Sequence, residues 1–74
     1  MEEPKITVVQ DLYTSSDGRE SIKYTATYLD PNDPRNDIIE EQANSAAQAL
    51  DRLYEVLEQR RGISRDTLPQ PRLL

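Results

Sequence analysis

Apolar and polar residues alternate through the N-terminal part of the chain. Between Ile6 and Leu29 the sequence is rich in β-branched and aromatic residues, and the turn-forming residues 15–18 interrupt it once. Because successive side chains of a strand point to opposite faces, this pattern predicts a β-hairpin with one polar and one apolar face. The apolar face of the predicted hairpin consists of Ile6, Val8, Leu12, Ile22, Tyr24, Ala26 and Tyr28.

The register of this hairpin follows from the requirement that one face be apolar. A two-residue turn would mix apolar and polar residues on both faces. A three-residue loop at residues 16–18, with Gly18 in the left-handed conformation, instead sets Leu12 opposite Ile22 and keeps one face apolar. We therefore predict the three-residue loop.

In the second half of the chain, the spacing of the apolar residues is that of a helix. Apolar residues recur at alternating spacings of four and three, which is typical of one face of a helix. This stripe consists of Ile39, Ala43, Ala46, Leu50, Leu53 and Leu57. One helix from Asp37 to Arg61, ended by Gly62, would be about 37 Å long. It would match a ten-residue strand of about 34 Å and could cover the hairpin.

A second interpretation of the same segment makes residues 38–42 a third strand. The helix would then start at Ser45, because Ser45 and Gln48 fit a capping box. The fold class is α+β in both cases, as a two-layer ββα or a βββα unit. In the second case, a strand leads through a Ser cap into the Ala-rich helix of residues 45–57, which resembles the arrangement in small HicB-type antitoxin domains.

The C-terminal residues show no period. We expect residues 1–62 to form a single ββα domain and residues 63–74, which contain two prolines, to be a flexible tail. The alternative for residues 68–74 is a short linear motif that docks on a partner in extended form.

Composition narrows the range of functions. Fourteen acidic and nine basic residues give a net charge of −5, which disfavours direct binding to nucleic acid or to an anionic membrane. Histidine and cysteine are absent, so the commonest general base, the strongest nucleophile and the usual transition-metal ligands are missing. Asp30, Asn32 and Glu41 stand at the first, third and twelfth positions of a calcium loop, but Arg35 stands where its sharp bend needs glycine. We expect no enzyme activity, no cofactor and no metal.

Acidic residues gather on the polar side of the predicted helix. Successive acids one turn apart are about 5 to 6 Å apart, near the spacing of phosphates along a nucleic-acid strand. Such a surface suits the basic groove of a partner protein, as a nucleic-acid mimic does. The candidate partner-binding residues are Asp37, Glu41, Asp51, Glu55 and Glu58.

These features together predict a small acidic, non-catalytic, cytoplasmic protein-binding module. We expect an inhibitor or antitoxin-like protein, of bacterial or phage type, that occupies the surface of a larger protein. The alternative is a structural or assembly subunit that forms homo-oligomers through its strand edges or its helix. Two strands and one helix bury little apolar surface, so a homodimer is also expected.

Overall fold

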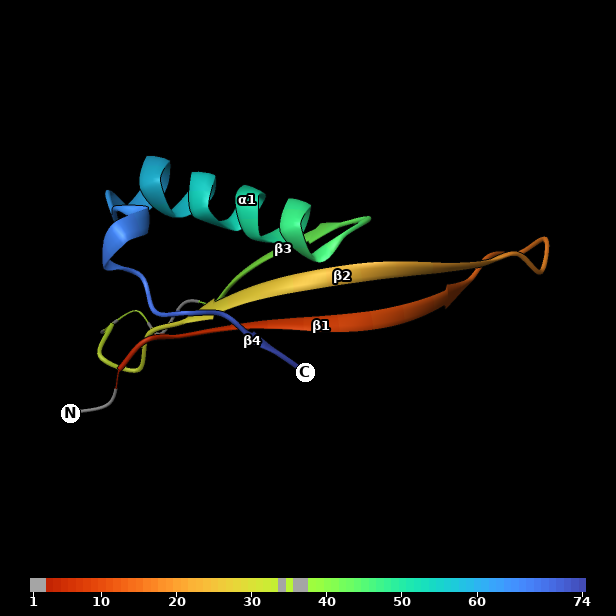
Figure 1. The fold of residues 1–74 in the computed structure, drawn as a ribbon, viewed down its shortest axis with the longest axis horizontal. Helices are drawn as coiled ribbons and strands as arrows, with labels where there is room; N and C mark the ends of the chain where they lie inside the picture. Colours follow the sequence, from red (N-terminus) through yellow and green to blue (C-terminus); the bar gives the residue numbers. More distant parts are fainter. Residues whose placement is uncertain (1–2, 34, 36–37) are drawn as a thin grey trace.

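The computed structural model describes residues 3–33, 35 and 38–74. It has an α+β fold in which one helix covers one face of a mixed four-stranded sheet (Figure 1). The strand order is β3-β2-β1-β4, and the molecule measures 45 × 20 × 20 Å. The elements are β1 Lys5–Thr14, β2 Glu20–Leu29, β3 Ile39–Ala43, α1 Ala46–Val56 and β4 Arg72–Leu73.

The hairpin formed by β1 and β2 has the predicted register. Leu12 lies opposite Ile22 in the antiparallel ladder, and the last pair before the loop is closed by the Ser15 N–H, which donates to the Arg19 carbonyl at 2.8 Å. Gly18 has a φ of 84°, the left-handed conformation that the three-residue loop requires. The prediction of the loop is confirmed.

The prediction of one helix starting at Asp37 is wrong. Residues 39–43 form β3, which pairs antiparallel with β2 from Tyr28 opposite Ile39 to Tyr24 opposite Ala43. The helix starts after Ser45, whose Oγ accepts a hydrogen bond from the Gln48 N–H at 3.2 Å. Ile39 and Ala43 fit a strand as well as a helix. The open edge of β2 decides between the two, because a strand there satisfies its backbone groups.

The helix ends at a left-handed glycine, as expected. After α1 the chain makes a π-helical turn, Leu57–Arg61, and Gly62 follows with a φ of 65°. The Ile63 N–H donates to the Leu57 carbonyl at 3.2 Å, which satisfies one of the free carbonyls at the helix end. The chain then turns back towards the sheet.

The core lies between α1 and the covered half of the sheet. β1, β2 and β3 contribute alternate side chains from one face of the sheet, whereas both residues of β4 are exposed. Of the stripe predicted for one long helix, Leu53 and Leu57 are buried on the helical segment, Ala43 is buried on β3, and Ala49 joins them without having been predicted. No polar or charged side chain among the described residues is fully buried. The buried residues are Ile6, Val8, Ala26, Tyr28, Ala43, Ala49, Leu53 and Leu57.

The C-terminal segment adds a fourth strand that neither sequence interpretation contained. It makes a 3₁₀ turn, Arg65–Thr67, packs Leu68 against the core and pairs β4 parallel to β1. The Leu74 N–H donates to the Val8 carbonyl at 2.9 Å. Because β3 and β4 are both parallel to β1, the chain crosses the sheet through α1. The flexibility of residues 63–74, and their separation from a domain of residues 1–62, stay predictions.

Candidate protein-binding surfaces

Three of the predicted partner-binding acids share one face of the helical segment. Asp51 and Glu55 on α1 and Glu58 in the turn that follows are all exposed. They recur at spacings of four and three, which places them on the side opposite the buried Leu53. We call Asp51, Glu55 and Glu58 the acidic face.

Neighbouring side chains compensate the acidic face only weakly. Arg65 Nη2 lies 3.5 Å from Asp51 Oδ1, and its guanidinium carbon stands 4.7 Å from the centroid of the Tyr54 ring. Gln59 Nε2 donates to Glu55 Oε1 at 3.3 Å. The Arg65 and Asp51 side chains are 61% and 71% exposed, so water screens this ion pair and it adds little stability. The acidic face therefore keeps most of its negative field.

The other two predicted acids do not extend this face. Glu41 lies on β3 opposite Ala26, half-buried beside Val56 and Arg60 rather than on the outer side of the helix. Asp37 lies outside the described residues. The predicted five-residue stripe assumed one continuous helix, and β3 breaks that continuity.

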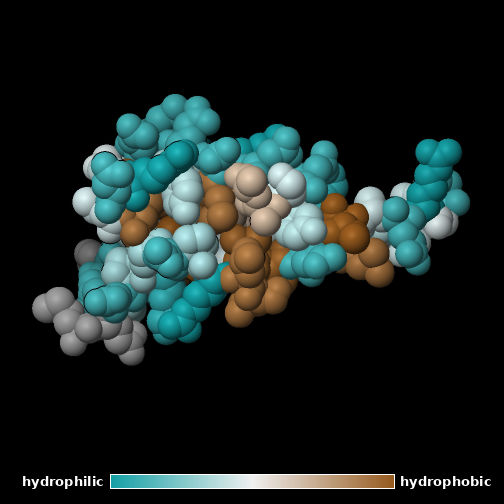
Figure 2. Space-filling view, in the orientation of Figure 1, coloured by the Kyte–Doolittle hydropathy of each residue, from teal (hydrophilic) through white to brown (hydrophobic). Residues whose placement is uncertain are grey.

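The hairpin extends well beyond the rest of the molecule. Its outer part, residues 10–23, runs past α1, β3 and β4, and we call it the arm (Figure 1). Leu12 is 65% exposed and Ile22 45% exposed, although the sequence placed both on the apolar face under a helix. Figure 2 shows apolar surface where the arm leaves the body. The eleven residues of α1 span only about 16 Å and do not reach it.

The arm also carries unpaired backbone on both edges. The Val8 carbonyl faces β4, since it accepts from the Leu74 N–H. Successive residues of β1 point their N–H and C=O groups alternately towards β2 and towards the opposite edge. Gln10, Leu12 and Thr14 therefore point theirs to the same edge as Val8, where the described residues provide no strand. On β2 the open stretch is residues 20–23, because β3 pairs from Tyr24 onward.

The outer edge of β3 is better protected. Arg52 of α1 reaches across it, and its Nη1 donates to the Gln42 carbonyl at 2.8 Å. Beside it, Lys23 Nζ donates to Asn44 Oδ1 at 2.6 Å. Charged side chains of this kind discourage a further strand from pairing. Compared with this edge, residues 10–14 of β1 are more accessible to another strand.

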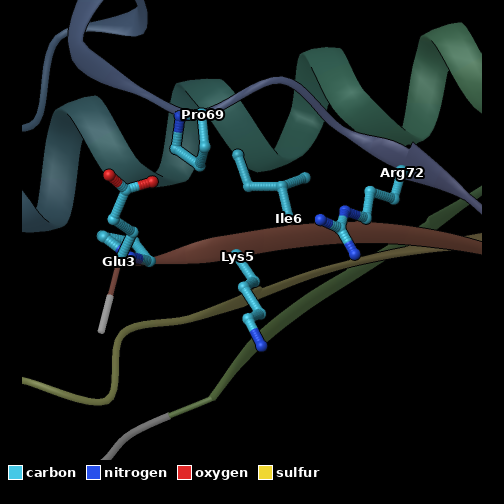
Figure 3. A pocket seen from close by; sticks show the side chains of 6 residues that line it. Glu3, Lys5, Ile6, Pro69 and Arg72 are labelled. Carbon is cyan, nitrogen blue, oxygen red and sulfur yellow. The ribbon is translucent and has the colours of Figure 1, made fainter. Parts of the chain in front are cut away.

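A shallow hollow separates the start of β1 from the C-terminal segment (Figure 3). Ile6 and Pro69 line its inner side, while the Lys5 side chain lies on the opposite side of β1. No buried side-chain nitrogen or oxygen among the described residues lacks a hydrogen-bond partner. The hollow thus lacks the converging buried polar groups of a small-molecule site. Its lining residues are Glu3, Pro4, Lys5, Ile6, Pro69 and Arg72.

Three titratable groups among the described residues have shifted pKa values. The Arg35 N–H and the Arg61 guanidinium lower the pKa of Asp33, whose ion pair with Arg61 ties the β2–β3 connection to the helix end. The Ser15 hydroxyl lowers the pKa of Asp17 within the hairpin loop. Burial raises the pKa of Tyr28 in the core. The charge of Asp33 also contributes to the raised pKa of Tyr28. Each shift thus follows from a contact that the fold itself makes.

Comparisons with known proteins leave the chain without an assigned family. No protein-family model matches the chain, and neither a curated protein nor a solved structure shows significant similarity to it. Across the described residues, no three acidic side chains gather in a way that could hold a metal ion. No described helix is both long and apolar enough to cross a bilayer. The acidic face and the arm are the two surfaces of the described chain that suit a binding partner.

Proposed function

We propose that this protein is a small non-catalytic binding module that inhibits a larger protein by occupying a basic surface on it. The observation that carries the proposal is the acidic face. Its three carboxylates are exposed on the side of the helical segment that faces away from the core. They contribute nothing to packing, so their alignment is available for a partner.

Electrostatics favours a basic partner. Asp51 and Glu55 stand four residues apart on α1, a like-charged pair that destabilises an isolated helix slightly. A row of Lys or Arg side chains on a partner would relieve this repulsion. Across an interface, complementary charges also speed association and exclude wrong partners.

The spacing of the carboxylates suits a groove that normally holds nucleic acid. Acids one turn apart on a helix are separated by about 5 to 6 Å, similar to successive phosphates. In this proposal the protein acts as a nucleic-acid mimic of the kind expected for bacterial antitoxins and phage-type inhibitors, and works in the cytoplasm. Glu41 faces another direction, so the three acids of the helical segment form the centre of the contact.

A pull-down from bacterial lysate at rising NaCl concentrations tests the proposal. The baits are the unaltered chain and a variant carrying Asp51→Asn, Glu55→Gln and Glu58→Gln. A matched control neutralises three exposed acids elsewhere, with Glu3→Gln, Glu20→Gln and Asp66→Asn. We expect the unaltered chain and the control to retain the same basic proteins, released by moderate salt. Retention of those proteins by the first variant, or binding that salt does not weaken, would refute the proposal.

A second candidate function is that of an assembly subunit that forms homo-oligomers. The arm favours it, because it combines exposed apolar side chains with an open strand edge. This function would be supported over inhibition by two results together. The chain should purify as a stable oligomer, and altering the arm should abolish its assembly rather than its binding to a partner.

A further inference from the structure

The geometry points to a homodimer in which residues 10–14 of β1 pair antiparallel with the same residues of a second copy. These five residues form the gap between Val9, beside which Leu74 lies after β4, and the start of the hairpin loop, at Ser15. Leu12 is the middle residue of the gap. A two-fold axis through Leu12, perpendicular to the sheet, therefore uses the whole open stretch of both copies.

The backbone of this stretch is self-complementary. With Leu12 on the axis, Gln10 of one copy faces Thr14 of the other, and all three residues point their N–H and C=O groups across the boundary. Each facing pair exchanges both hydrogen bonds of an antiparallel ladder. A two-stranded ribbon is only marginally stable in water, so the second copy also supplies the neighbouring strands that the arm lacks.

The side chains of the two copies are compatible in this register. Leu12 meets Leu12 on the helix side of the sheet, and Ile22 lies next to it in each copy. The exposed apolar side chains thus become one continuous strip across the boundary. On the other side of the sheet, Asp11 faces Tyr13, and no pair brings like charges together.

The remaining edges fit a second copy less well. A two-fold axis at Ser21 of β2 would set Arg19 opposite Lys23, two basic residues. An axis at Ile22 would set Glu20 of one copy opposite Tyr24 of the other, and β3 already pairs with Tyr24. The outer edge of β3 is crossed by Arg52, which binds the Gln42 carbonyl. Residues 10–14 are therefore the surface on which this inference rests.

The dimer is independent of the acidic face but relevant to the proposed function. Pairing about an axis perpendicular to the sheet keeps the α1 helices of both copies on the same side, so neither acidic face is covered. A five-residue contact is small, and we expect a weak dimer. Each copy has a net charge of −5, so added salt should strengthen the dimer while it weakens binding to a basic partner. Failure of one idea is thus distinguishable from failure of the other.

Opposite charges placed at Leu12 test the two-fold axis directly. Sedimentation equilibrium, run from about 5 to about 500 µM protein, should show a monomer–dimer equilibrium for the unaltered chain. Leu12→Glu and Leu12→Lys each place like charges on the axis and should each weaken the dimer about tenfold or more. An equimolar mixture should recover a dimer within about threefold of the original affinity, because Glu then faces Lys.

The same charge exchange at Ile22 is the control. Ile22 is exposed on the same face but lies one strand away from the axis, so its side chain does not meet that of the second copy. A mixture of Ile22→Glu with Ile22→Lys should therefore dimerise no more strongly than either variant alone. Leu12 is 65% exposed, and unchanged far-ultraviolet circular dichroism should show that its variants remain folded. A purely monomeric unaltered chain, or equal recovery at Leu12 and Ile22, would overturn the inference. Recovery at Leu12 alone supports it.

Discussion

The body and the arm are built from the same two strands, yet the same pattern has opposite outcomes in them. In the body, Ile6 and Val8 alternate with polar residues and are buried beneath α1. In the arm, Leu12 and Ile22 continue that alternation and remain exposed. Alternation thus decides which face of a strand is apolar. Whether that face is buried depends on how far the covering helix reaches.

Truncating one leucine in each region should give the largest contrast. Leu53→Ala removes a side chain that is 0% exposed and should lower the free energy of unfolding by about 2–5 kcal/mol. Leu12→Ala, measured by urea unfolding at about 5 µM so that arms are unpaired, should change it by less than about 0.5 kcal/mol. Equal losses from the two substitutions would show that the arm is covered.

The two glycines offer the same substitution in each region. Gly18 and Gly62 both have left-handed φ angles, and an added Cβ would meet no atom within 4 Å at either position. Alanine should therefore act through backbone strain alone, about 1–2 kcal/mol. For Gly18→Ala we expect faster amide hydrogen exchange in residues 10–23 only. Gly62→Ala should instead lower the free energy of global unfolding. Faster exchange in the arm from Gly62→Ala, or a loss of global stability from Gly18→Ala, would contradict the separation of arm and body.

The helix cap should show a smaller effect confined to the body. Ser45→Ala removes the acceptor of the Gln48 N–H and should cost about 1 kcal/mol in thermal or urea unfolding. Ser64→Ala is the matched control. Ser64 precedes the 3₁₀ turn but makes no side-chain capping bond within the described chain, so its loss should be close to neutral. A comparable loss from both variants would mean that the cap does not stabilise α1.

The smallest effect on stability should come from lowering the pH, through the carboxylate of Asp33. Because the folded state lowers the pKa of Asp33, this carboxylate stabilises the fold above its ordinary pKa of about 3.9. The stabilisation is lost as the pH falls through the lower, folded value, since protonation removes the contacts with Arg35 and Arg61. Asp33→Asn should lower the melting temperature by a few degrees at pH 7 and reduce its dependence on pH near 4. An unchanged pH profile would exclude this role.

Local chemistry made part of the fold predictable. The register of β1 with β2 follows from Gly18 and the demand for one apolar face, and Ser45 marks a helix start through its capping bond. The choice between a strand and a helix at residues 39–43 needed the open edge of β2, which only the assembled sheet provides. The strand β4 has just two residues, too few for any period.

The candidate surfaces were predictable to a different degree. Asp51, Glu55 and Glu58 align because helical spacing in the segment after Ser45 is strong. Glu41 does not join them, because it lies in a strand. The arm was not foreseen, since the sequence matched the hairpin with a helix of similar length. The shorter observed helix leaves Leu12 and Ile22 without cover.

The pairing of β4 with β1 has a consequence for the order of folding. It joins Thr7 to Arg72, near opposite ends of the sequence, whereas β1 and β2 are joined by a short loop. Closing the longer loop costs more chain entropy, so the hairpin should form first and β4 should dock late. Until then, the edge of β1 is open along residues 7–14. Refolding at high protein concentration should therefore pass through transient association that dilution removes.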